Sequence, residues 1–216
     1  MSFVDLQKVF GFMLEASVET LKLFAITILL GLPLGLLACM GRMSKSFIIR
    51  NIVKFYLLIM RGTPLILQLM FWKYGPAYLF ELNLDIFTAA TLAFVFNYAA
   101  YFAEIYRSGI ESIPVGQKEA ATVLGFSRTQ VFFKIVLPQV VKRILPPMSN
   151  EFMTLVKDTS LAQVIGYAEI YQLATSKMSF YVNISPLVMA GVFYLVMNLV
   201  VSRAFAMAEK KYSYYR

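Results

Sequence analysis

A few charged residues lie within long apolar stretches of this sequence, where each of them needs a partner. The clearest case is Glu151, because polar side chains lie within one helical turn of it: Ser149, Asn150 and Thr154. An ionised side chain inside a membrane span costs about 2.5–3.5 kcal/mol on insertion scales, so its presence marks a candidate functional site. A carboxylate in that position attracts a cationic group. These residue types therefore favour the binding of a cation over covalent chemistry.

The partner of Glu151 has two alternatives. It can be Arg61, which lies in another apolar stretch and would form a structural ion pair. It can instead be a positively charged group of a bound molecule, which would make Glu151 a binding residue. Glu104 and Arg107 are three residues apart on one helical face, so we expect these two to pair with each other.

Several kinds of chemistry are excluded by the residue types. The sequence has no His, and its single Cys39 lies in an apolar run, which favours a buried, inert thiol. There is no CxxC pair and no GxxxxGK[ST] phosphate-binding loop. We therefore expect no metal site, no catalytic residue and no nucleotide bound by this chain.

The composition is that of a membrane protein. Hydrophobic residues make up 59% of the 216 residues and charged residues 15%, against about 45–50% and about 25% in soluble domains. The apolar stretches leave no room for a separate globular unit, so residues 1–216 are predicted to form one all-α transmembrane domain. The net charge of +8 is not gathered into a basic stripe with interleaved aromatic residues, so nucleic-acid binding is not expected.

Five stretches are candidates for membrane spans. Residues 21–40, 84–103 and 187–207 are each about 20 mostly apolar residues, the length a bilayer requires. Residues 52–73 and 138–156 contain prolines and charges, and we include both because broken or polar helices occur at membrane depth where they line a cavity. The sequence therefore predicts five spans.

Packing between the spans is indicated by small residues. Gly31 and Gly35 lie four apart around Pro33, which suits close approach of a neighbouring helix. Residues 89–103 are rich in alanine, which keeps that span thin. We expect helix contacts at both places.

The basic residues predict the orientation. With five spans, 14 of the 20 Lys and Arg residues fall on the same side of the membrane. The positive-inside rule then places the N-terminus outside and the C-terminus in the cytoplasm.

Residues 112–138 interrupt the apolar pattern with a polar, basic stretch on the cytoplasmic side. Pro114 suits the first turn of a short helix that continues through Glu119-Ala120-Ala121 and ends at Gly125. A second helical piece, residues 127–135, leads to Pro138, which begins the next span. Such a helix can rest on anionic membrane lipid or can dock on another protein.

The spacing in this loop resembles a known pattern. Glu-Ala-Ala, then Gly125, then Ile135-x-Leu137-Pro138 resembles the cytoplasmic EAA loop of bacterial ABC importer permeases. Three further motifs, RGTP with Gln68 at residues 61–68, AEIYRSGI at 103–110 and KDTSL at 157–161, are similar to those of the polar amino-acid uptake permeases. The resemblance extends over about residues 17–210.

The resemblance implies a type I importer permease with five spans per subunit in the bacterial plasma membrane. Such permeases form homodimers or heterodimers and receive substrate from an extracytoplasmic binding protein. Their EAA loop docks on a cytoplasmic ATPase subunit, which holds the ATP and Mg²⁺, while the permease carries no cofactor. The coupling role then falls on Glu119, Ala120, Ala121 and Gly125.

The resemblance also implies an amino-acid substrate. Glu151, with Asn150 and Thr154, would then receive the positive charge of arginine, lysine or histidine, while Asn97 and Tyr98 would supply neutral hydrogen bonds or bond between helices. A substrate of the glutamine or glutamate type in the same family is one alternative. The other is an ATP-independent channel or secondary transporter, which would leave the loop spacing unexplained.

Overall fold

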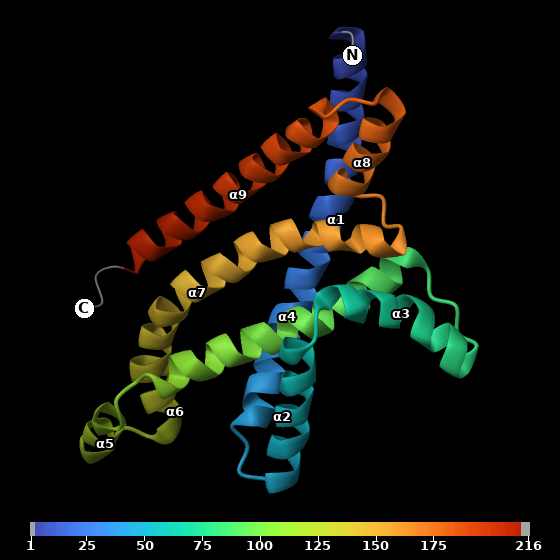
Figure 1. The fold of residues 1–216 in the computed structure, drawn as a ribbon. Helices are drawn as coiled ribbons and strands as arrows, with labels where there is room; N and C mark the ends of the chain where they lie inside the picture. Colours follow the sequence, from blue (N-terminus) through green and yellow to red (C-terminus); the bar gives the residue numbers. More distant parts are fainter. Residues whose placement is uncertain (1–2, 213–216) are drawn as a thin grey trace.

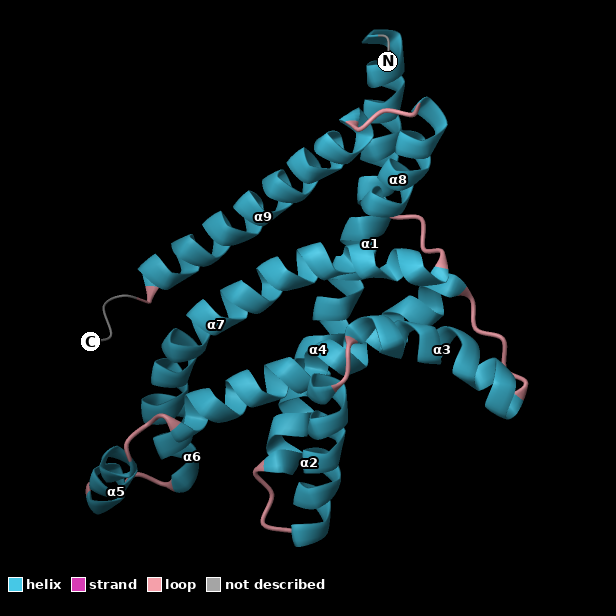
Figure 2. Ribbon diagram, viewed as in Figure 1, coloured by secondary structure: helices cyan, strands magenta, loops and turns pink. Residues whose placement is uncertain are grey.

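The protein is all helical in the residues that its computed structural model describes, 3–212 (Figures 1 and 2). This range contains no strand, which confirms the all-α part of the predicted fold class. In chain order the elements are α1 (Phe3–Arg42), α2 (Phe47–Gly62), α3 (Leu65–Phe80), α4 (Ile86–Glu111), α5 (Val115–Val123), α6 (Arg128–Gln130), the π-helical turn η1 (Val131–Val136), α7 (Leu137–Asp158), the 3₁₀ helix η2 (Thr159–Ile165), α8 (Ile170–Tyr181) and α9 (Ser185–Lys211).

The most extensive helix packing is between α1 and α4. Gly35 of α1 lies so close to α4 that an added Cβ atom would stand 2.8 Å from Cβ of Phe102 and 3.0 Å from the backbone oxygen of Ala99. The alanines of α4 that were expected to make helix contacts are buried: Ala89, Ala90, Ala93, Ala99, Ala100 and Ala103. Both packing predictions are therefore confirmed.

Gly35→Ala is expected to destabilise the protein, because the added methyl group overlaps atoms of α4. Overpacking of this kind costs about 1–3 kcal/mol. The matched control is Gly11→Ala in the same helix, where an added Cβ meets nothing within 4 Å. Thermal unfolding of the purified protein in detergent should show a lower midpoint for Gly35→Ala only, and equal midpoints for the two variants would contradict the prediction.

A sharp bend separates α2 from α3. The two helices meet at 107°, because Pro64 has no N–H to donate and disfavours a helical conformation at Thr63. The carbonyl groups freed by the bend find side-chain donors. Gln68 Nε2 donates to the backbone oxygens of Met60 (3.0 Å) and Thr63 (3.2 Å), and Asn97 Nδ2 also donates to that of Met60 (2.9 Å).

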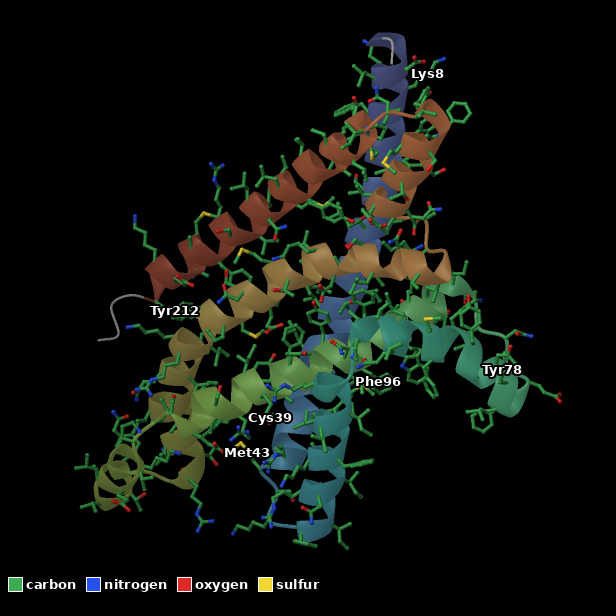
Figure 3. The ribbon with its side chains drawn as sticks, in the orientation of Figure 1. Lys8, Cys39, Met43, Tyr78, Phe96 and Tyr212 are labelled. Carbon is green, nitrogen blue, oxygen red and sulfur yellow. The ribbon has the colours of Figure 1, made fainter. Side chains whose placement is uncertain are left out.

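The bent pair is attached to α4 on both sides of the bend. Tyr56 of α2 donates a hydrogen bond of 2.6 Å to the Phe96 carbonyl oxygen, and Trp72 of α3 stacks on the Phe96 ring with centroids 5.4 Å apart. Figure 3 labels Phe96. At the start of α4, Asp85 caps the helix by accepting hydrogen bonds from the N–H and hydroxyl of Thr88. These bonds hold the pKa of Asp85 below its usual value. The position of the bend relative to α4 is thus set by specific contacts.

The remaining long helices, α7, α8 and α9, pack against α1, against α4 and against one another. The middle helix α7 packs against α4 and α9, and α8 packs against α1 and α9 (Figure 1). Three helices of the described part are long and apolar enough to cross a membrane: α1, α4 and α9. The pair α2–α3 also qualifies when it is counted as one broken span, which gives up to four. The fifth predicted span corresponds to α7, which is amphipathic and is not among these apolar helices. The count of five therefore remains a prediction.

The interrupting segment forms a short helix as expected. The first part, α5, is followed by Gly125 with φ of +81°, a left-handed conformation that glycine adopts without strain. Ser127 and Gln130 form a reciprocal capping box at the start of α6. From there the chain is helical through η1 into α7, with Pro138 in the first turn of α7. This segment lies at the far ends of α4 and α7, at the lower left of Figure 1.

Candidate functional site

A cavity of about 500 Å³ lies where the bend between α2 and α3 faces α4 and α7. A volume of this size suits a small-molecule ligand. Its lining residues are Arg61, Gly62, Thr63, Pro64 and Leu65 at the bend, Asn97, Tyr98 and Tyr101 of α4, Glu151, Thr154 and Asp158 of α7, and Leu161 of η2. Four of the five predicted substrate-binding residues are thus brought together around one cavity.

The α7 wall of the cavity carries two carboxylates. Glu151, Thr154 and Asp158 follow one another at intervals of three and four residues, which places them along a single face of the helix. The charged residues of the lining are these two carboxylates and Arg61, so the lining has a formal charge of −1. Such a site attracts a cation and repels an anion.

Asp158 was not among the site residues predicted from the sequence, where its KDTSL motif served only for the resemblance to a family. The i, i+3, i+7 spacing from Glu151 could have identified it. Its orientation depends on Tyr98, whose hydroxyl donates a hydrogen bond of 2.8 Å to Asp158 Oδ2. Tyr98 is almost fully buried and stacks on Phe94. Tyr98 therefore holds one of the two carboxylates in place from the neighbouring helix.

Asn97 realises one of the two alternatives that the sequence left open, and Asn150 lies away from the cavity. The Asn97 amide group donates hydrogen bonds to the Met60 carbonyl oxygen and to Gln68 Oε1 (3.1 Å), so it makes the interhelix bonds that were the second alternative. Asn150 is exposed and is not part of the cavity lining. Successive residues of a helix point about 100° apart, so Asn150 does not share the helix face on which Glu151 lines the cavity.

The charged residues of α4 form the pair that was expected. Arg107 Nη2 lies 2.7 Å from Glu104 Oε2, and Arg107 also bonds to Glu111. Arg61 makes its ion pair with Glu104, at 3.8 Å. Across residues 3–212 no ion pair joins Arg61 to Glu151, so that alternative is not realised in this structure.

The residues of α5 divide between two faces. Glu119 and Ala120 are exposed, whereas Ala121 is 3% exposed and packs in a cluster with Ile113, Val131, Val136 and Val140. The exposed face is available to a partner, and the buried face fixes α5 to the ends of α4 and α7. A force applied to α5 would therefore reach α4 and α7, two of the helices that line the cavity.

Long apolar helices, a broken helix beside a charged cavity and a short exposed helix joined to the cavity walls define a membrane transport subunit. A family model described as "Binding-protein-dependent transport system inner membrane component" matches residues 31–214, and the chain belongs to this family. It is a transport subunit of the inner membrane, with the ATPase on a separate subunit, and not an enzyme.

Two curated relatives cover nearly the whole chain. The arginine transport system permease protein ArtQ of Bacillus subtilis (strain 168) is 36% identical over 93% of this chain and 92% of its own length. The putative glutamine transport system permease protein GlnP of Rickettsia typhi is 30% identical over the same shares. The L-cystine transport system permease protein TcyB of Bacillus subtilis is 40% identical over 72% of this chain and 66% of its own length.

Solved structures show the same fold. A crystal structure of an amino acid ABC transporter with histidines has a TM-score of 0.90 and 32% identity, covering 98% of this chain and 99% of that one. An inward-facing form of the MetNI methionine ABC transporter has a TM-score of 0.72 at 17% identity, which shows the fold alone. These likenesses confirm the resemblance to amino-acid ABC importer permeases and the type I importer permease fold.

Proposed function

We propose that this chain is the permease subunit of an ATP-driven importer of cationic L-amino acids. The observation that carries the proposal is the pair of carboxylates, Glu151 and Asp158, on the wall of a cavity whose formal charge is −1. A substrate with a positively charged side chain brings this charge to zero, whereas a glutamate would add like charge in a site of low dielectric constant. The arginine permease among the relatives supports this choice.

A neutral substrate of the glutamine type is the second candidate, because the putative glutamine permeases match over the same part of the chain. Such a substrate would hydrogen-bond to Thr154 and to the carboxylates without neutralising them. The net charge of the lining favours the cationic substrate.

The assembly follows from the same proposal. Two permease subunits, identical or different, meet in the bacterial plasma membrane and receive substrate from an extracytoplasmic binding protein. An ATPase dimer that binds ATP and Mg²⁺ contacts α5 through Glu119 and Ala120, with Ala121 and Gly125 shaping the helix. The amphipathic α7 is the fifth span, which has one face on the cavity. The N-terminus then lies outside and the C-terminus in the cytoplasm.

Uptake of radiolabelled arginine into proteoliposomes tests this function. The vesicles hold the permease with its ATPase partner and the binding protein, and ATP is either enclosed or left out. We expect arginine uptake only with ATP, with competition by lysine or histidine but not by glutamine. Arginine uptake without ATP would overturn the importer, and ATP-dependent uptake of glutamine alone would overturn the cationic substrate.

A further inference from the structure

Arg61 lies at the boundary between the substrate cavity and a second cavity. It lines the first cavity together with Glu151 and Asp158. It also lines a neighbouring space of about 420 Å³, whose other lining residues are Arg42 of α1, Lys54, Leu57, Leu58 and Gly62 of α2, and Glu104 of α4. The two spaces therefore share the Arg61 side chain as part of their walls.

Arg61 is held loosely. A guanidinium group has five N–H donors, yet across residues 3–212 the structure gives this one no hydrogen bond and a single ion pair at 3.8 Å. Its side chain is 43% exposed, and its nearest aromatic contact is the Tyr101 ring, 5.5 Å away. The side chain is therefore free to adopt other rotamers.

Glu104 is satisfied without Arg61. Arg107 donates to both of its carboxylate oxygens, from Nε at 3.1 and 3.2 Å and from Nη2 at 2.7 Å. Arg107 makes three hydrogen bonds to Glu104, whereas Arg61 makes one long ion pair with it. Arg61 can therefore leave Glu104 without exposing an unpaired carboxylate. The two carboxylates of the substrate cavity, by contrast, have no second arginine in the lining.

The substrate cavity needs a cation. Glu151 and Asp158 carry two negative charges there, and unpaired charges at membrane depth are costly. Arg61 is the cationic member of the lining that holds Glu151, and it also forms an ion pair with Glu104. It is thus placed between two acidic sites, of which one has its own arginine and the other does not.

We propose that Arg61 is a movable counter-ion that competes with the substrate for the carboxylates of the cavity. In the position that this structure shows, Arg61 pairs with Glu104 and leaves the two carboxylates to a cationic amino acid. In a second position it turns toward Glu151 and Asp158, and there it competes with that substrate. Its return helps to displace the substrate from the carboxylates. This inference rests on the proposed function, since it requires a cationic substrate.

Equilibrium binding and turnover together test the counter-ion. Arginine and glutamine binding are measured on the complete permease–ATPase complex in nanodiscs, without the binding protein, for the wild type, Arg61→Gln, Arg61→Lys and Glu104→Gln. ATP-dependent arginine uptake is measured on the same variants with the binding protein added. A scintillation proximity assay with the radiolabelled amino acid gives Kd.

We expect Arg61→Gln to bind arginine about fivefold more tightly, the effect of removing a competing ion pair of a partly exposed group. Its uptake turnover should fall, because nothing displaces the bound substrate, and its glutamine Kd should not change. Arg61→Lys keeps the charge and should resemble the wild type. Glu104→Gln removes the alternative partner of Arg61 and should weaken arginine binding, while Arg107 keeps its bond to Glu111.

Arginine affinity is expected to rise in Arg61→Gln and to fall in Glu104→Gln. These opposite signs distinguish the counter-ion role from a structural one. Weaker or unchanged arginine binding in Arg61→Gln, or tighter binding in Glu104→Gln, would overturn the counter-ion. If Arg61→Gln does not fold, an arginine Kd of Glu104→Gln equal to that of the wild type overturns it. A wild type that binds glutamine but not arginine would instead overturn the proposed function, so the two failures are distinguishable.

Discussion

Glu151→Gln is expected to weaken arginine binding by about 10- to 100-fold, since hydrogen bonds to charged groups contribute about 1.5–3 kcal/mol. The substitution keeps the size and the hydrogen-bonding capacity of the side chain and removes its charge. Binding of glutamine, which brings no side-chain charge into the cavity, should change by less than about threefold on the same reasoning. The measurement is the Kd of both amino acids on the permease–ATPase complex in nanodiscs.

The control for Glu151→Gln is Glu15→Gln, which makes the same chemical change on an exposed position of α1. It should leave both dissociation constants unaltered. Asp158→Asn should weaken arginine binding less than Glu151→Gln does, because the Tyr98 hydroxyl already occupies one carboxylate oxygen of Asp158. An equal loss of arginine and glutamine binding in Glu151→Gln would show that the charge of Glu151 does not select the substrate.

Glu119→Lys should reduce ATP-dependent uptake by more than about tenfold while arginine binding to the cavity persists. Glu119 is exposed on α5, where a partner can contact it. If α5 docks on the ATPase as proposed, the reversed charge replaces an attraction by a repulsion at that interface. Like charges brought together across an interface cost several kcal/mol. Uptake into proteoliposomes and equilibrium binding in nanodiscs measure the two effects separately.

Glu209→Lys provides the matched control, since Glu209 is an exposed glutamate on α9. Its uptake should equal that of the wild type. Ala121→Leu separates the faces of α5 further, because its added volume enters the buried cluster around Val131 and Val136 and acts on stability, by about 1–3 kcal/mol. Normal uptake by Glu119→Lys would remove Glu119 from the coupling surface.

Local features of this fold could be predicted from the sequence because each depends on residues near one another in the chain. Apolar length gave the three plain spans, and helical spacing gave the Glu104–Arg107 pair. Proline and glycine chemistry gave the limits of α5, where Gly125 adopts a positive φ. Even the close approach of another helix to Gly35 was indicated, because only small residues permit it.

The composition of the cavity was decided by the tertiary structure. Periodicity places residues on a face of a helix, but it does not tell which helix that face meets. The sequence therefore included Asn150, which is exposed, and omitted Asp158, which Tyr98 holds at the cavity wall. Asn97 is committed to the carbonyl group freed by the bend between α2 and α3, a demand that exists only once the chain has bent.

Arg61 shows the same division. Its type and its place in an apolar stretch indicated from the sequence that it needs a carboxylate partner. The sequence offered Glu151, 90 residues away, as that partner and assigned Glu104 to Arg107, because spacing along the chain does not show which helices meet. The 107° bend and the packing of α4 place Arg61 beside Glu104 and on the wall that it shares with Glu151. Residue chemistry thus determined which groups require partners, and the three-dimensional arrangement of helices determined which partners they have.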